Sequence, residues 1–416
     1  MNNLNKISAS IVLAMSLAAC GGGSDGGTST PKPPVTKPPV TNPPVTPPVT
    51  NPTTPPVTDP TTPPVTDPTT PPDTDPVEPP VTTPPSNDDD VKIALAANNT
   101  LSMKRSECGF GGLEYNDQLT KAAVAHNNYL KYVQENAARL VFDHHTELPL
   151  VGYEDITGKN NPYFTGYTAS DRINQTSYAN KQYGAFENIA SRIEYGGVTS
   201  SRTNQEIADI LLRSLLAAPF HTRALLDQRA IDSGMGFATF VPKGDYPSTP
   251  RGYTLTSMSG VANSISYNPK AKKGVLTYPC DGQVGLSTAL YNESPNPFGN
   301  SRNLAANPIG QSVYVIDNDA TEMKVSNVVF TDTDHKIDIP VQILDASTNP
   351  HQFKGTDLRE NEAFLMPLTD NLKTCRNEKS NCGLYPSTNH SVSFDVVSDG
   401  KLIRKTIKFK TGLADR

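Results

Sequence analysis

A proline-rich stretch near the N-terminus sets the strongest limit on what this chain can fold into. Most of the 38 prolines lie before residue 90, in repeats such as Pro-Pro-Val-Thr at residues 33–36 and 55–58. Proline fixes φ and removes a backbone donor, so a run this dense forms neither helix nor sheet. We therefore expect residues 20–90 to be a disordered, extended polyproline-type spacer, in which about 55 residues reach roughly 170 Å. A ligand for proline-recognising modules is the alternative interpretation, but the regular period is that of a spacer.

The residues before the spacer predict export and anchoring. Lys6 precedes a short apolar run over residues 7–19, which ends in Leu-Ala-Ala followed by Cys20. A run this short is typical of a secretory signal and does not span a bilayer. The segment resembles the lipobox of bacterial lipoproteins. This resemblance implies a signal peptide over residues 1–19, lipidation of Cys20 that includes palmitate, and attachment to a membrane. Gly21 after the cysteine favours the outer membrane, with the protein periplasmic or surface-exposed. An ordinary signal peptide with a chance cysteine is the alternative.

Four cysteines remain after Cys20, and their even number in an exported chain suggests two disulfide bonds. Cys375 and Cys382 would close a small loop, which would leave Cys108 to join Cys280. Three connectivities are open, and the sequence does not choose between them. A zinc site built from cysteines is not expected, because no C-x-x-C pair occurs.

Residues 91–268, which follow the acidic boundary at residues 88–90, read as a mixed α and β domain. Asn116 is a plausible N-cap, and apolar side chains recur after it at helical spacing up to Val133, with His126 among them. We assign His126 to the core and give it no function. A second helix is expected from about Asn204, ended or kinked by Pro219. Strands are expected over residues 236–241 and 253–258.

This region resembles the CAP superfamily, which comprises the cysteine-rich secretory, antigen 5 and pathogenesis-related-1 proteins and is also called SCP-like. The resemblance rests on several weak motifs that occur in the family's order. The matching segments are residues 113–119, 126–130, 144–147, 164–168, 187–190, 219–226 and 234–237.

The resemblance implies an α-β-α sandwich with a binding cleft in which two histidines and acidic residues meet. By position, His145, Glu187 and His221 are the corresponding site residues here. The family's second glutamate falls on Ser214, so this chain departs from the family pattern. Glu147 is a candidate for the missing carboxylate, and His144 replaces His145 if the register slips by one residue.

The expected site suggests zinc as a cofactor, because two imidazoles and a carboxylate leave one position open on the metal. His145, Glu187 and His221 would be the ligands, and binding would be weak if Ser214 replaces one. Hydrolysis would also require a general base, for which Glu147 is a candidate. No catalytic residue is assigned, since no Ser-His-Asp or Cys-His signature stands out. The Gly-x-Ser-x-Gly match at residues 22–26 lies in the spacer and is a chance match.

Residues 269–416 show a different pattern, made of short β segments. Strands are expected over residues 312–316, 325–330 and 337–344, and alternating residues on either side of Asp399-Gly400 predict a hairpin. We expect an antiparallel β-sandwich, loosely similar to bacterial immunoglobulin-like domains, that serves as an accessory module. The loop at residues 293–297 is expected to pack against the first domain. The fold class of the whole chain is therefore α+β.

Three functions follow from these features. The favoured one is an envelope-anchored protein that binds a small ligand, a lipid or a partner in the His/Glu cleft. The alternatives are a metal-assisted hydrolase acting on cell-wall or peptide substrates, and a structural envelope protein that uses the fold as a scaffold. The net charge of -6 and the pI near 5.7 argue against nucleic acid as a partner.

Overall fold

The structure is a computed structural model that describes residues 16–18, 88–137, 144–195, 202–244, 250–262, 267–353, 355–375 and 380–414. Cys20, the predicted lipidation site, and the predicted spacer up to residue 87 lie outside these ranges, so the predictions made for them stay predictions. The three residues of β1 (Ser16–Ala18) pair antiparallel with β3 (Ala185–Tyr195).

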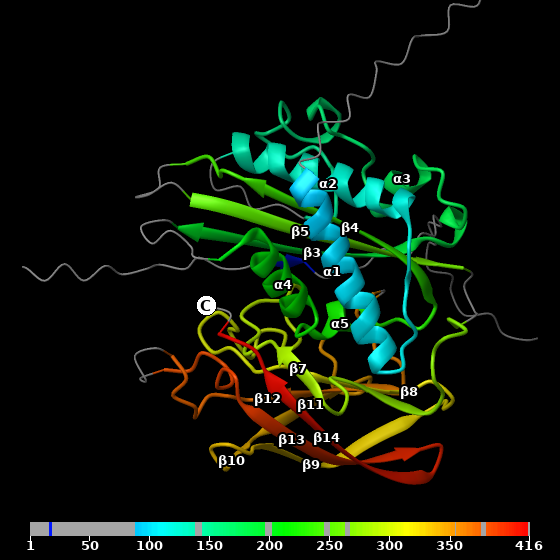
Figure 1. Ribbon diagram of the computed structural model, residues 1–416, viewed down its shortest axis with the longest axis vertical. Helices are drawn as coiled ribbons and strands as arrows, with labels where there is room; N and C mark the ends of the chain where they lie inside the picture. The colour runs from blue at the N-terminus through cyan, green and yellow to red at the C-terminus, as the bar shows by residue number, and fades with distance from the viewer. Residues whose placement is uncertain are drawn as a thin grey trace, which may run out of the picture. The chain divides into compact units, whose positions relative to one another are not determined.

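The N-terminal half is built on a five-stranded sheet in the order β1-β3-β5-β4-β2 (Figure 1). Strands β3, β5 (Pro250–Val261) and β4 (Ala230–Phe240) are antiparallel, and β2 (Glu114–Tyr115) runs parallel to β4. The predicted strands at residues 236–241 and 253–258 fall almost wholly within β4 and β5. Gly234 and Gly236 of β4 face α2 (Asp117–Asn136), where an added Cβ at Gly234 would lie 2.2 Å from Thr120 N. The two glycines therefore allow this helix to lie directly on the sheet.

Helices cover both faces of this sheet. On one face, Met258 packs with Leu119 and Ala122 of α2, next to α3 (Ala169–Asn174). On the other face, Phe237 belongs to a core with Leu211 of α4 (Asn204–Leu215). The same core takes in residues of α1 (Asp88–Glu107) and α5 (Pro219–Leu225). The layers are thus helix, sheet and helix, as expected, with short 3₁₀ helices at Gly158–Asn160 and Lys181–Tyr183.

The two helices expected from periodicity are present. Asn116 caps α2 by accepting hydrogen bonds from the backbone N–H groups of Gln118 and Leu119, and α4 begins at Asn204. One expectation was wrong: α4 ends at Leu215, and Pro219 instead begins α5, where a missing N–H is tolerated. Helix α1 was not expected, and it starts within the acidic residues taken as a boundary.

The C-terminal half consists of two packed sheets. One has the order β10-β9-β13-β14-β7 and the other β11-β12-β8-β6. All pairs are antiparallel except β7 with β14. Ser398 of β13 donates to Asp317 of β8 across the sheets, with 2.7 Å between their side-chain oxygens. The bounds of these strands are β6 Val275–Tyr278, β7 Gln283–Leu286, β8 Val313–Asp317, β9 Met323–Asp332, β10 Ile337–Ile339, β11 Val341–Asp345, β12 Glu362–Pro367, β13 Asn389–Ser398 and β14 Lys401–Thr411.

Most of the expected β segments occur, including the hairpin of β13 and β14, which turns at Asp399 and Gly400 with positive φ at both residues. The strand expected over residues 337–344 is two strands, because Pro340 separates β10 from β11 and the two join different sheets. Proline lacks the N–H that a continuous ladder needs at that point.

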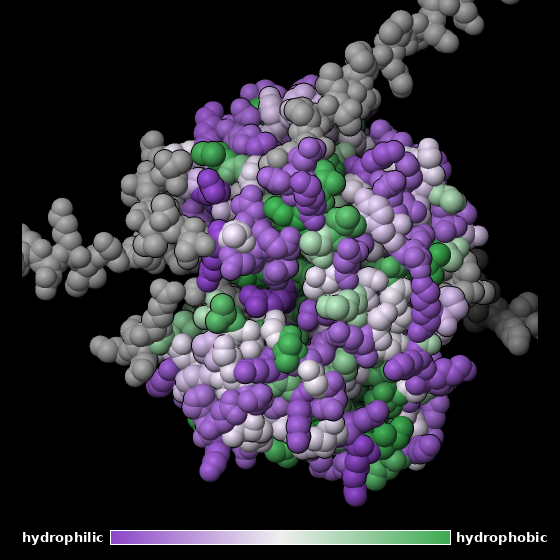
Figure 2. Space-filling view, in the orientation of Figure 1, coloured by the Kyte–Doolittle hydropathy of each residue, from purple (hydrophilic) through white to green (hydrophobic). Residues whose placement is uncertain are grey.

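The two halves share one hydrophobic core and are joined covalently. Buried residues of α1, α4 and β4 belong to the same cluster as Val315 and Phe364 of the C-terminal sheets. Cys108 is bonded to Cys280 and Cys375 to Cys382, so the structure selects one of the three open connectivities. The chain is α+β, as expected. No helix within the described ranges is long and apolar enough to cross a membrane. Figure 2 shows hydrophilic side chains spread over the visible face, with pale and hydrophobic groups between them.

Candidate functional site

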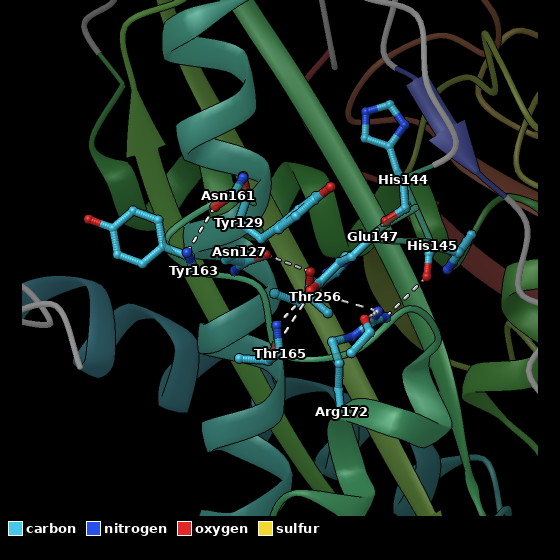
Figure 3. A network of polar contacts seen from close by, with 12 residues as sticks. Asn127, Tyr129, His144, His145, Glu147, Asn161, Tyr163, Thr165, Arg172 and Thr256 are labelled. Atoms are coloured by element: carbon cyan, nitrogen blue, oxygen red, sulfur yellow. Dashed lines mark hydrogen bonds and ion pairs between the residues drawn. The ribbon is translucent and has the colours of Figure 1, made fainter. Parts of the chain in front are cut away.

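Two of the predicted site residues, His145 and Glu187, are in direct contact. Nδ1 of His145 lies 2.9 Å from Oε1 of Glu187. The second carboxylate oxygen of Glu187 accepts a hydrogen bond from Nη2 of Arg172 at 2.5 Å, and the same guanidinium donates to the backbone oxygen of His145 (Figure 3). Glu187 and Arg172 are buried, whereas 15% of the His145 side chain is exposed. Of these three side chains, His145 is therefore the one in contact with solvent. The histidine beside Glu187 is His145 and not His144.

Glu147 belongs to the same group but bonds to a histidine that we had assigned to the core. Its Oε1 lies 2.8 Å from Nδ1 of His126, and its Oε2 accepts from the backbone N–H of Thr165 at 2.8 Å. Neither the Glu147 nor the His126 side chain is exposed. Arg172 lies 3.8 Å from Glu147, which links the two histidine–carboxylate pairs into one cluster. We call His126, His145, Glu147, Arg172 and Glu187 the ionic cluster.

Hydrogen-bond geometry indicates how charge is distributed in the ionic cluster. Nε2 of His126 lies 2.6 Å from the backbone oxygen of His144, and a carbonyl oxygen only accepts, so Nε2 carries a proton. If Glu147 is ionised it too only accepts, and the His126 ring is then a cation. If the proton sits on Glu147 instead, both groups are neutral. The pair has no net charge in either case, and Arg172 with Glu187 likewise cancels.

The pKa of Glu187 reflects this arrangement. Burial raises the pKa, but the neighbouring Arg172, His126 and His145 lower it more, so the pKa lies well below its ordinary value. Glu187 is therefore ionised throughout the physiological range. It acts as a fixed anion that orients the imidazole of His145 and the guanidinium of Arg172.

Local structure explains how these side chains come together. Thr168 and Asp171 form a capping box that starts α3, and Arg172 follows directly on the first turn of that helix. The backbone N–H of Glu147 donates to the oxygen of Tyr167, so the two ends of the intervening loop are held together. Tyr129 of α2 accepts a hydrogen bond from Gly158 within the same loop. The ionic cluster thus joins this loop to α2, α3 and β3.

His221, the other predicted site residue, is paired with a carboxylate from the C-terminal half. Its Nδ1 lies 3.2 Å from Oε1 of Glu293, which also accepts from the backbone N–H of Phe220 at 2.7 Å. His221 and Glu293 are buried. Burial raises the pKa of Glu293, while His221 and the adjacent backbone N–H groups act in the opposite direction. The loop at residues 293–297 does pack against the first half, as expected.

Ser214, at the position of the family's second glutamate, takes no part in either group. Its hydroxyl donates to the backbone oxygen of Leu211 one turn earlier in α4, at 2.7 Å. The side chain is buried and short, so its bond stays within its own helix.

The predicted zinc ligands do not fit a metal centre in this arrangement. Across the ranges that the structure describes, no three His, Cys, Asp or Glu side chains are grouped to hold a metal ion. Each of the predicted ligands is instead engaged in a histidine–carboxylate pair, with Glu187 bonded to His145 and His221 to Glu293. Zinc binding remains an untested prediction, and no chemical step is derived from it.

Sequence reasoning missed three residues that the structure places beside the predicted ones. Arg172 was given no role, His126 was assigned to the core because it lies on an apolar helix stripe, and Glu293 was noted only as part of a packing loop. Comparison of the sequence with known protein families and with curated proteins finds no match. The resemblance to the CAP superfamily therefore stays a prediction.

Proposed function

We propose that this chain is an envelope-anchored lipoprotein whose N-terminal half is a CAP-type domain that binds a small ligand, a lipid or a partner at His145. The lipobox at Cys20 and the proline-rich spacer would hold the domain away from an outer membrane. The order of the motifs and the helix–sheet–helix layers support the family assignment.

One observation carries the binding proposal: a partly exposed imidazole rests on a buried group of paired charges. His145 is held by Glu187, and Glu187 is held by Arg172. A side chain fixed in this way keeps one orientation, and pre-organisation reduces the entropy lost when a ligand binds. The buried charges behind His145 balance one another, so the site favours a ligand that hydrogen-bonds over one that carries a large net charge.

The ionic cluster gives less support to the hydrolase alternative. A general base has to reach the proton it removes, yet Glu147 is fully buried and bonded to His126 and Thr165. Glu187 is buried beneath its bonds to His145 and Arg172, and its lowered pKa makes it a weak base. We therefore favour binding, with His145 as the residue that meets the ligand.

The test uses purified protein spanning residues 88–416 in titration calorimetry. The probes are vesicles of phosphatidylethanolamine and soluble peptidoglycan fragments. We expect saturable binding of at least one probe that is lost in His145→Ala and retained in His335→Ala, a control at an exposed histidine in the turn between β9 and β10. Equal binding by the His145→Ala variant, or no binding by any probe, would contradict the proposal.

A further inference from the structure

A group of buried polar side chains lies on the central strands of the N-terminal sheet. In antiparallel strands, residues that lie directly across from one another point to the same face of the sheet. Ser257 of β5 lies across from Asn188 of β3, and Ser259, two residues further along β5, lies across from Ser233 of β4. These four side chains therefore stand next to one another on one face, and we call them the polar block.

The face that carries the polar block is the one covered by α1, α4 and α5. Met235 lies directly across from Ser257 and belongs to the hydrophobic core that this face shares with those helices. Glu187 and Met258 alternate with the residues of the block along their strands, and Met258 packs against α2 on the other face. The sheet itself thus separates the polar block from the ionic cluster.

The polar atoms of the block have no hydrogen-bond partner among the described residues. These atoms are the hydroxyl oxygens of Ser233, Ser257 and Ser259 and both amide atoms of Asn188. All four residues are 0% exposed. A buried hydroxyl or amide without a hydrogen bond is unfavourable, because its bonds to bulk water are lost and nothing replaces them. Three hydroxyls and a carboxamide in one place therefore indicate a partner that is not part of the chain.

The chemistry of the polar block selects the kind of partner. A hydroxyl and a carboxamide each offer both a donor and an acceptor, and neither carries a charge. At one margin of the block, Phe186 lies across from Ser259, and the guanidinium of Arg229 lies over the Phe186 ring at 5.3 Å. Arg229 also bonds to Asp227 at 2.8 Å, so the two charges at this margin cancel. An uncharged partner that both donates and accepts hydrogen bonds fits these surroundings best.

We propose that the polar block is an internal binding site for a small uncharged guest that both donates and accepts hydrogen bonds. Ordered water and a small organic molecule with hydroxyl or amide groups share this chemistry. Phe186 is half-buried and 34% of the Arg229 side chain is exposed, so the margin formed by these two residues borders on solvent. The site lies on the face of the sheet away from Glu187 and does not depend on binding at His145.

The test is the direction in which stability changes when a hydroxyl of the block is removed. The chain from residue 20 onward, with Cys20→Ser so that no lipid is attached, is unfolded in urea. If a guest is bound, Ser257→Ala and Ser259→Ala each deprive it of a hydrogen bond, and we expect the unfolding midpoint to fall. If the hydroxyls have no partner, their removal takes away an unfavourable buried group and the midpoint rises. A rise or no change in both variants overturns the inference.

Two serine-to-alanine controls calibrate the shift. Ser191→Ala removes a buried hydroxyl of β3 that lies 3.0 Å from Oγ1 of Thr254, so it shows the fall expected when a partnered hydroxyl is lost. Ser391→Ala, at a half-buried serine of β13, measures the effect of the same exchange in a strand outside the block. At least one block variant should fall below Ser391→Ala and approach Ser191→Ala. Block variants that both match Ser391→Ala overturn the inference.

Mass spectrometry of the small molecules released when the purified chain is denatured distinguishes the two sources of the guest. An organic molecule released in equimolar amount identifies that guest, and a fall in the midpoint without any such molecule identifies it as water. In a His145→Ala background, the block variants should show the same shifts, because the two sites are independent. Altered shifts would overturn the claim of a separate site, whereas failure of every probe to bind at His145 would affect the proposed function alone.

Discussion

His126 and Glu147 form a fully buried histidine–carboxylate pair, with Nδ1 and Oε1 2.8 Å apart and neither side chain exposed. The other ring nitrogen, Nε2, lies 2.6 Å from the backbone oxygen of His144. A single imidazole on α2 therefore holds both the side chain of Glu147 and the backbone just before His145. The position of the partly exposed His145 depends on an interaction that lies wholly within the core.

We predict that His126→Ala destabilises the fold strongly, because it leaves Glu147 buried without its main partner. Removing one member leaves the other buried without its partner, which costs about 1–3 kcal/mol for a neutral pair and about 3–5 kcal/mol for a charged pair. Lys131→Ala is the matched control on the same helix, since Lys131 forms a partly exposed pair with Glu135 and should cost about 1 kcal/mol or less. Urea unfolding followed by circular dichroism measures both, and similar losses for the two variants would contradict the buried-pair interpretation.

The helices could be predicted where the sequence carries both a cap and a strong periodicity. The N-cap at Asn116 and the apolar stripe up to Val133 predicted α2. The alternation of apolar and polar residues on either side of Asp399 predicted the hairpin of β13 and β14. Helix α1 was missed because its buried positions, such as Ala97 and Leu101, stand among residues of mixed polarity. Local patterns also do not distinguish a proline that ends a helix from one that begins the next, as Pro219 does.

The site was harder to predict because its members come from distant parts of the chain. His145 and Glu187 were found through a resemblance, which fixes positions in order. Glu293 could not be found in that way, because it belongs to a half that the resemblance does not cover. The pairing of His126 with Glu147 could not be predicted from helical spacing. A histidine on an apolar helix face shows the same sequence pattern whether or not a carboxylate lies opposite it.

We predict that the free energy of unfolding falls at acidic pH because of His390, a residue of the C-terminal sheets. This side chain is buried between Phe330 and Phe409, and neither ring nitrogen has a hydrogen-bond partner in the described part of the chain. Burial lowers the pKa of His390 to about 4, although Asp332 acts in the opposite direction. Between about pH 6.5 and pH 4 the unfolded chain therefore takes up a proton that the folded chain does not, so the free energy of unfolding falls as the pH falls.

The loss across this window is about 3 kcal/mol, from roughly 1.4 kcal/mol for each unit of pKa difference. His390→Phe should remove it, whereas His351→Gln, at a histidine bonded to the backbone oxygen of Asn296, should retain it. Chemical unfolding at a series of pH values measures the slope. An unaltered slope in His390→Phe would exclude His390 as its source.

We predict that the two disulfides stabilise the fold unequally. The bond between Cys108 and Cys280 closes a span of 172 residues and joins the two halves, whereas the bond between Cys375 and Cys382 closes a span of 7. From the loop-closure entropy of the unfolded chain, replacing both cysteines by alanine should cost about 5 kcal/mol for the long span and about 2 kcal/mol for the short one. Thermal unfolding of the two double variants tests the order, and a larger loss for the short span would contradict it.

We predict that Cys20→Ser releases the protein from the membrane without changing the folded region. The lipobox resemblance makes the thiol of Cys20 the only expected attachment point, and no helix in the described residues could replace it as a membrane span. Detergent phase partitioning should move the protein from the membrane fraction to the aqueous fraction, while the unfolding midpoint of residues 88–416 stays the same. Lys6→Gln is the control, because it alters the signal segment but leaves the thiol in place. Continued membrane attachment of Cys20→Ser would show that the anchor lies elsewhere, and the lipoprotein proposal would then be wrong even if the ionic cluster binds its ligand.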